Sequence, residues 1–241
     1  MKNEKLNLPD CVTQELKMKN QNSQIINLKS KICLLLFAML LVSSAFGQRL
    51  ITVDSAGYAL QKFYLSQHVD SLWRSGQHVN WETGQAEIST STKDKGAHCS
   101  AFVASVCKQK NIYILRPPKH ETELLANAQY TWLHSAEAAA QGWTPLKQNP
   151  MERAQQLADS GVMVVVCYKN PNPKWSGHIA FVMPSDISTD SIAASGPRLI
   201  QAGKTNSNNM SLKAAFGRHI KDWTQVTGGV AFFYVDKRIK N

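Results

Sequence analysis

Cys99 and His178 are the two residues of this chain whose types and surroundings favour covalent chemistry. Cys99 follows a polar loop and opens a predicted helix over 99–110. The amide groups at a helix N-terminus stabilise an anion, so they favour a thiolate and lower the pKa of the thiol. Taken alone, Cys99 fits equally well as the first core residue of its helix. A cysteine nucleophile also needs a base, and histidine is the usual partner.

His178 stands at the start of a predicted strand that is otherwise apolar, directly after Gly177. Glycine at such a position permits close approach of another chain segment or a substrate. Alternation along the strand places His178, Ala180 and Val182 on one face. A lone histidine at a strand end is more often a surface or core residue, but together with Cys99 it becomes a candidate base.

A third polar residue would hold the imidazole in the required tautomer. Gln201 is a single amide within an apolar strand predicted over 198–202. An unpaired buried amide is costly, so we expect Gln201 to have a partner, which is His178 if the two strands pair antiparallel. The alternative is that Gln201 bonds to backbone or water. Three nearby amides are rivals for the orienting role: Asn206, Asn208 and Asn209.

The elements that carry these residues run from helices to an antiparallel-looking sheet, an order that predicts an α+β domain. We expect one such domain over residues 48–241, with loop at 78–96 and mixed short helix and loop at 120–148. The predicted helices are 54–76, 99–110, 149–160 with Asn149 as cap, and a short one at 211–216. The predicted strands are 162–167, 179–183, 198–202 and 229–235.

The first 47 residues have the parts of a secretory signal peptide. Lys29 and Lys31 precede an apolar run over 32–42, and small residues lead to Gly47. The run is too short for a comfortable membrane anchor, so we expect export to the periplasm or the medium. The signal begins late, and Met18 is an alternative start.

The net charge of +10 and the pI of about 9.4 favour polyanionic surroundings. The basic residues are spread along the chain without a dense block, which argues against nucleic-acid binding. For an exported protein the expected partner is the anionic cell envelope. The sequence does not indicate an oligomeric state.

Three cysteines follow position 47, namely Cys99, Cys107 and Cys167. An odd number leaves at least one thiol unpaired, and a disulfide between Cys107 and Cys167 would leave Cys99. Cys107 lies two helical turns after Cys99 and fits a buried apolar position. A zinc site from His98, Cys99 and His178 is a weaker alternative, because closely spaced ligand pairs are absent. We therefore predict no metal and no cofactor.

The runs Cys99-Ser100-Ala101-Phe102-Val103 and Gly177-His178-Ile179-Ala180-Phe181-Val182 resemble the papain-like cell-wall hydrolases, which include the NlpC-type peptidases and CHAP amidases. The likeness covers roughly residues 90–205 in order and spacing, and only these two short motifs are specific. It implies a papain-like fold with Cys99 as nucleophile and His178 as base. Gln201 matches the third position, where the NlpC branch usually has His and related branches have Asn, Gln or Glu.

The resemblance implies hydrolysis of amide bonds in peptidoglycan peptides through a thioester on Cys99. His98 and Ala101 stand where the NlpC branch usually has Asp and Gly, which leaves the branch and the bond cleaved open. The backbone N–H of Cys99 is a candidate oxyanion donor, and Tyr58 or Trp81 is a candidate second donor. Two other functions stay open: a non-catalytic envelope-binding module, or an amidase or acyltransferase acting outside the cell wall.

Overall fold

The computed structural model describes residues 29, 31, 50–74, 76–87, 99–121, 124–217 and 230–237. The chain divides into two units, Met1–Gln48 and Arg49–Asn241, and the elements described below belong to the second. The predicted signal peptide therefore lies outside the described residues, apart from Lys29 and Lys31. Among the residues that are described, no helix is long and apolar enough to cross a membrane.

A six-stranded sheet forms the centre of the second unit, and every neighbouring pair of its strands is antiparallel. Its middle strand β5 is apolar along its length, and all six of its residues are buried. The predicted α+β class with an antiparallel sheet is therefore confirmed. In spatial order the strands are β4 (Trp143–Pro145), β10 (Val230–Val235), β5 (Met163–Tyr168), β6 (His178–Val182), β8 (Arg198–Gln201) and β9 (Ser207–Ser211).

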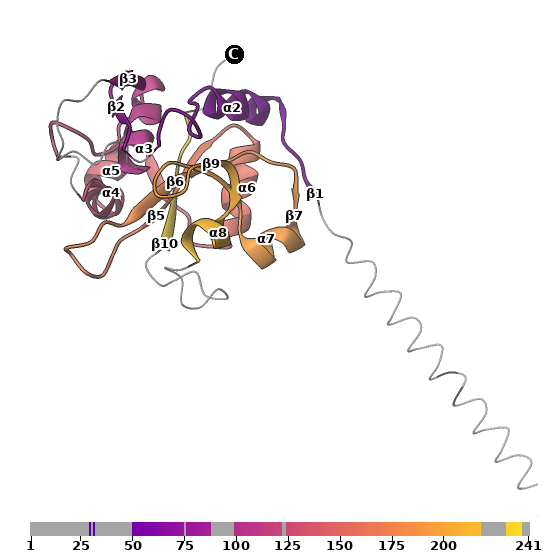
Figure 1. The fold of residues 1–241 in the computed structure, drawn as a ribbon. Coiled ribbons are helices and arrows are strands. Elements are labelled where there is room, and N and C mark those ends of the chain that lie inside the picture. The colour runs from indigo at the N-terminus through magenta and orange to yellow at the C-terminus, as the bar shows by residue number, and fades with distance from the viewer. Residues whose placement is uncertain are drawn as a thin grey trace, which may run out of the picture. The chain divides into compact units, whose positions relative to one another are not determined.

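Helices cover both faces of this sheet, because alternate side chains of its strands point into two separate cores. Ile179 and Phe181 of β6 pack in the core that contains α3 (Cys99–Gln109). Ala180 and Val182 pack in the other core, with residues of α6 (Pro150–Asp159) and α8 (Leu212–Phe216). Figure 1 shows α3 and α4 on one side of β5 and β6, and α6 and α8 on the other.

The first predicted helix is shorter than expected. α2 spans Ser55–Leu65, and Asp54 caps it by accepting a hydrogen bond from the Gly57 N–H at 2.8 Å. The predicted extension to residue 76 is wrong, because the chain turns after Leu65 and His68 has a φ of 50°. A right-handed helix cannot continue through that conformation.

α6 begins and ends where the sequence predicts, but its cap differs. Pro150 opens the helix, and Gly161 follows its end with a φ of 80°. Asn149 adopts a φ of 43°, and its side chain makes no capping hydrogen bond, so the predicted Asn cap is wrong. Proline at the first position needs no N–H acceptor, which reduces the demand for a side-chain cap.

Several short elements lie in segments for which we gave no exact bounds. Residues 78–87 form a hairpin where we expected loop. The 120–148 segment contains two short helices, as expected there, and an edge strand that we did not expect. The two hairpin strands pair with each other, whereas the strand that contains Leu50 pairs with a distant segment, as Leu50 pairs with Ser188. These elements are β1 (Leu50–Ile51), β2 (His78–Asn80), β3 (Gln85–Glu87), α4 (Leu125–Leu133), α5 (Ala136–Ala140), β7 (Ile187–Ser188) and α7 (Thr189–Ser195).

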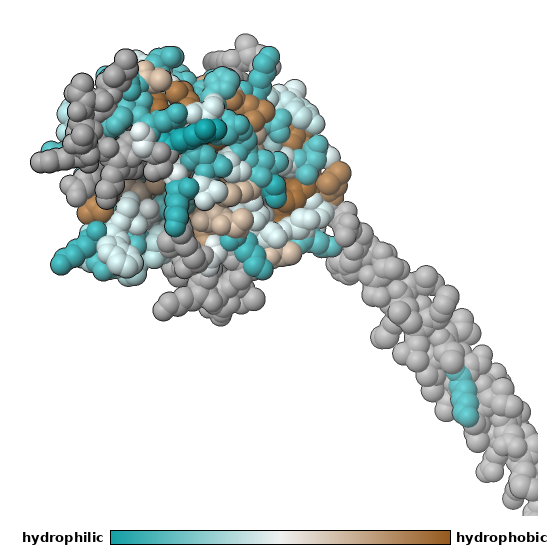
Figure 2. All heavy atoms as spheres, in the orientation of Figure 1, coloured by the Kyte–Doolittle hydropathy of each residue, from teal (hydrophilic) through white to brown (hydrophobic). Residues whose placement is uncertain are grey.

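The surface on the side shown in Figure 2 mixes hydrophilic and hydrophobic residues. Large hydrophobic side chains are exposed singly at Leu50, Tyr58, Leu65 and Trp175. Isolated exposed residues of this kind are normal for a folded domain and do not mark an interface.

Candidate active site

Cys99 is the first residue of α3, and its side chain is buried against the start of β6. Its sulfur lies within hydrogen-bonding reach of the His178 side chain and of the backbone N–H groups of Ile179 and Ser100. Ile179 belongs to β6 and Ser100 to α3, so both elements contribute donors to one sulfur. The two residues predicted to do chemistry are therefore in contact, although 78 positions separate them in the sequence.

The surroundings of Cys99 favour its thiolate. Burial has the largest effect on the pKa of this thiol and raises it. The charge of His178, a hydrogen bond with its side chain, and the N–H groups of Ile179 and Ser100 together outweigh burial. The pKa of Cys99 consequently lies below the usual value for a cysteine, as nucleophilic chemistry at neutral pH requires.

Gln201 holds the imidazole of His178 from the other side. Its Oε1 lies 2.8 Å from His178 Nε2, and its Nε2 donates to the carbonyl oxygen of Thr205 at 2.7 Å. The bond to Thr205 fixes which end of the amide faces the ring. Since Oε1 can only accept, Nε2 of His178 carries the ring proton, and Nδ1 is the nitrogen that can take the proton of the thiol.

The strand register explains why Gln201 reaches His178. β6 pairs with β8 through Phe181↔Ile200 and Val182↔Leu199. Continuing that register places Gly203 opposite His178 and Gln201 diagonally across from it, on the same face. Gly203 has a φ of 144°, and a Cβ there would lie 3.6 Å from Cε1 of His178. The glycine therefore permits the turn that returns Thr205 to Gln201.

The rival amides have other partners or positions. Asn206 accepts from the Gly203 N–H at 2.9 Å and donates to the carbonyl oxygen of Val69, so it anchors the turn after β8. Asn209 accepts from the Arg198 guanidinium at 2.6 Å. The Oδ1 of Asn208 is buried without a hydrogen-bond partner among the described residues. Of the four predicted candidates, Gln201 is the one that forms a hydrogen bond with the His178 ring among the described residues.

Phe216 is a site neighbour that the sequence did not indicate. Its ring packs on the His178 imidazole, with centroids 4.7 Å apart and planes inclined by 46°. Phe216 ends α8 and belongs to the core opposite α3. At the end of the sheet, His178 therefore contacts Cys99 from the core that contains α3 and Phe216 from the core on the opposite face. No periodicity within 211–216 could have predicted that contact, because it depends on how α8 packs on the sheet.

The two side chains considered as second oxyanion donors have contacts elsewhere. The Tyr58 hydroxyl lies 3.5 Å from Asp186, which follows the end of β6 opposite to His178. Trp81 stacks with the ammonium of Lys108, 5.2 Å from its ring centroid. Lys108 is nine residues after Cys99, about 13 Å along the helix axis. Neither contact brings a donor to Cys99, so neither expectation is supported.

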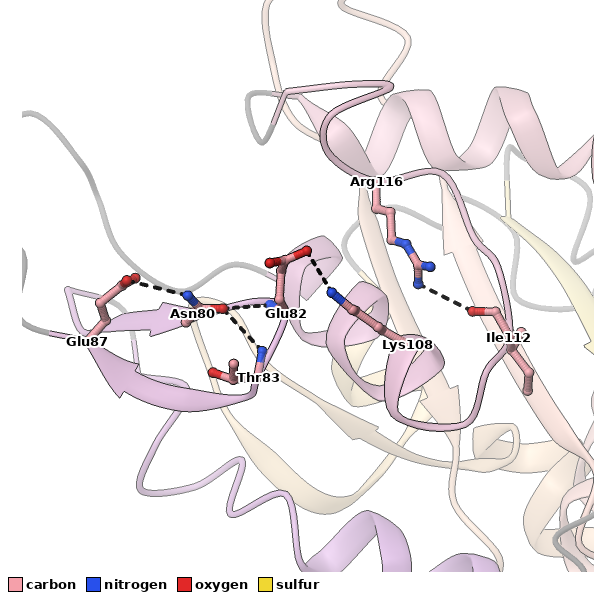
Figure 3. Close-up of polar contacts among 7 residues, drawn as sticks. All are labelled: Asn80, Glu82, Thr83, Glu87, Lys108, Ile112 and Arg116. Atoms are coloured by element: carbon pink, nitrogen blue, oxygen red, sulfur yellow. Dashed lines mark hydrogen bonds and ion pairs between the residues drawn. The ribbon is translucent and has the colours of Figure 1, made fainter.

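Figure 3 shows the region around that far end of α3. Glu82, in the turn between β2 and β3, bonds to Lys108 at 2.6 Å, and Asn80 holds the turn by accepting from the Glu82 and Thr83 N–H groups. Arg116 reaches the carbonyl oxygen of Ile112. The pair of Glu82 and Lys108 attaches the hairpin to the C-terminal end of α3, and none of these contacts involves Cys99, His178 or Gln201.

The three cysteines of the second unit are all free and buried, so the alternative disulfide between Cys107 and Cys167 is not formed. Burial raises the pKa of both these thiols well above the usual value. Within the described residues, no three His, Cys, Asp or Glu side chains are grouped so that they could hold a metal ion. His98, a member of the alternative zinc set, lies outside the residues that the structure describes.

Comparison with protein-family models and with curated proteins finds no match for this chain.

Proposed function

We propose that this protein is a cysteine hydrolase that cleaves amide bonds of peptidoglycan peptides. The observation that carries the proposal is the contact of a thiol of lowered pKa with an imidazole that a buried amide orients: Cys99, His178 and Gln201. A buried cysteine without chemistry needs neither a histidine partner nor a second residue that selects the tautomer of that histidine.

The geometry supports the following reaction. His178 takes the proton of Cys99, and the thiolate attacks the carbonyl carbon of an amide. The tetrahedral intermediate collapses to a thioester, and the leaving amine takes the proton from the imidazolium. Water then attacks the thioester with His178 as base, which releases the carboxylic acid and restores the thiol. At both stages the Nε2–H of His178 donates to Oε1 of Gln201, and this bond stabilises the imidazolium.

We propose a papain-like arrangement for the fold on three features. The nucleophile begins a helix that packs on the sheet, the histidine begins a strand, and the third residue lies on the next strand of the same antiparallel sheet. Export and an envelope partner complete the proposal. They rest on the sequence of residues 1–47 and on the net charge of +10.

The test is digestion of purified peptidoglycan by the purified protein, with Cys99→Ala as the inactive variant and Cys107→Ala as the matched control. We expect wild type and Cys107→Ala to release soluble muropeptides and Cys99→Ala to release none. Mass spectrometry of the fragments distinguishes cleavage within the peptide from cleavage at the sugar–peptide amide. Undiminished release by Cys99→Ala contradicts the assignment of the nucleophile.

The same samples separate catalysis from binding. If wild type sediments with peptidoglycan but releases no fragments, the protein is an envelope-binding module and the hydrolase proposal is wrong. If wild type neither binds nor cleaves peptidoglycan although Cys99 is reactive, the substrate is an amide outside the cell wall.

A further inference from the structure

α4 packs against both elements that carry Cys99 and His178. It contacts α3 as well as β5 and β6. Ala126, Trp132 and Leu133 anchor it in the core that also contains Cys99. Two amide side chains of this helix, Asn127 and Gln129, extend to opposite neighbours, because two residues along a helix correspond to a rotation of about 200°.

Asn127 binds both sides of the connection that leads into β6. Its Oδ1 accepts from the Asn170 N–H at 3.0 Å, and its Nδ2 donates to the carbonyl oxygen of Trp175 at 2.8 Å. Asn170 follows β5, and Trp175 comes three residues before His178. The Asn127 amide therefore links the two ends of the β5–β6 connection just before β6 begins at His178.

Gly177 makes this approach possible. A Cβ at Gly177 would lie 2.6 Å from Oδ1 of Asn127 and would also collide with the carbonyl oxygen of Tyr168. Tyr168 is the register partner of His178, so Asn127 packs on the last residue pair of β5 and β6. Any side chain at Gly177 would push α4 away from the residue pair that contains His178.

Gln129 holds the other half of the site. It is fully buried, and its Nε2 donates to the carbonyl oxygens of Ser100 and Leu115 at 3.2 and 3.1 Å. Ser100 directly follows Cys99 in the first turn of α3. These two bonds satisfy the buried Nε2 group, whereas Oε1 of Gln129 has no hydrogen-bond partner among the described residues. The first turn of α3 is thereby attached to α4 by a side chain as well as by core packing.

We propose that α4 is a positioning element, in which Asn127 and Gln129 set the separation between the Cys99 sulfur and the His178 imidazole. This inference rests on the proposed function, since the pair that it positions is the proposed catalytic pair. Asn127 fixes where β6 begins, and Gln129 fixes where α3 begins. Misplacement of reacting groups by about 1 Å can cost about a hundredfold in rate, so both are positioning residues.

The experiment compares Asn127→Ala with Asn172→Ala in the full chain. Asn172 lies in the same connection and bonds within it, accepting from the Lys174 N–H at 3.0 Å and donating its own N–H to Asn170. Alkylation of Cys99 by iodoacetamide is measured against pH, together with peptidoglycan hydrolysis. We expect Asn127→Ala to shift the alkylation profile to higher pH, to slow alkylation at pH 7 by about threefold to tenfold, and to lower hydrolysis at least about tenfold.

Circular dichroism and thermal unfolding establish that each variant is folded. Asn127→Asp keeps the acceptor for Asn170 and loses the donor to Trp175, so it serves if the alanine variant does not fold, and we expect an intermediate shift. A folded Asn127→Ala or Asn127→Asp variant with the wild-type alkylation profile overturns the positioning role. So does an equal shift in Asn172→Ala.

The alkylation profile keeps this inference distinguishable from the proposed function. If wild type hydrolyses nothing but Asn127→Ala still shifts the profile of Cys99, the positioning role holds and the proposed substrate fails. If wild type hydrolyses peptidoglycan and Asn127→Ala changes neither readout, the positioning role fails and the hydrolase stands.

Discussion

The two ends of α3 each carry a cysteine, and the pKa values of the two thiols are shifted in opposite directions. Cys99 and Cys107 lie on one helix, two turns apart, and both are buried in the same core. Burial raises the pKa of Cys107, whose surroundings include the distant charge of Arg116 but no hydrogen-bond donor that compensates. Cys99 is also buried, yet His178 and the N–H groups of Ile179 and Ser100 lower its pKa. Burial therefore does not by itself decide the direction of the pKa shift of these thiols; the polar groups at the end of the sheet do.

The largest expected difference is in thiol reactivity. In the folded protein at pH 7, we expect iodoacetamide to modify Cys99 and to leave Cys107 and Cys167 unmodified, a contrast of at least about a thousandfold in rate. Because the pKa of Cys99 is lowered, its rate should rise with pH at values below those usual for a cysteine. Peptide mapping after timed alkylation measures this. If iodoacetamide modifies Cys107 before Cys99 in the folded protein, the predicted difference between the two thiols is wrong.

Removing the imidazole should make Cys99 behave like Cys107. In His178→Ala the thiol stays buried but loses both the charge and the hydrogen bond of the ring, so its pKa should rise above the usual value. We expect alkylation at pH 7 to fall at least about tenfold and hydrolysis about a thousandfold. Rates for wild type and variant are compared across pH 5–10. An unchanged alkylation profile in a folded variant would remove His178 from the site.

The orienting amide should have a smaller effect than the imidazole. Gln201→Ala leaves the thiol and the ring in place but frees the ring to rotate and to change tautomer, and we expect hydrolysis to fall about tenfold to a hundredfold. Asn209→Ala, on the neighbouring strand β9, is the control and should retain wild-type rates. Equal activity of Gln201→Ala and Asn209→Ala would show that the His178–Gln201 bond is structural.

The smallest effect is expected at the unreactive end of the helix. Cys107→Ala removes a fully buried sulfur from the core, and we expect a loss of about 1–2 kcal/mol in the free energy of unfolding. Hydrolysis per folded molecule should not change. Urea unfolding and a rate normalised to folded protein check both parts. A folded Cys107→Ala variant with low activity would show that this thiol also serves the site.

Local sequence signals were sufficient for the long elements of the fold. The buried run that became β5 and the apolar spacing of α3 each depend on contacts that the residue types themselves specify, and both lie within two residues of the predicted bounds. The end of α2 was not predictable in this way, because His68 takes a φ of 50° with no glycine or proline to mark it. Two-residue strands such as β1 and β7 were also missed, since each exists only through pairing with the other.

The residue types of the site were readable from the sequence, and their partnership was predicted from the resemblance rather than from any local pattern. A cysteine opening a helix, a histidine opening a strand and one amide in an apolar strand could be singled out because each is unusual in its local setting. The contacts of Asn127, Gln129 and Phe216 had no such signal, because each joins elements separated by more than ten residues in the chain.

The sequence by itself determined the long elements and placed Cys99 and His178 at the starts of two of them, because hydrophobic period acts over a few neighbouring residues. It left the third polar residue open among Gln201 and three nearby asparagines. Only the tertiary structure decided that these ends meet. The register of β6 against β8 sets Gln201 diagonal to His178, and the packing of α3 on β6 brings the Ile179 N–H to the sulfur of Cys99. Both depend on long-range contacts whose geometry no local pattern encodes.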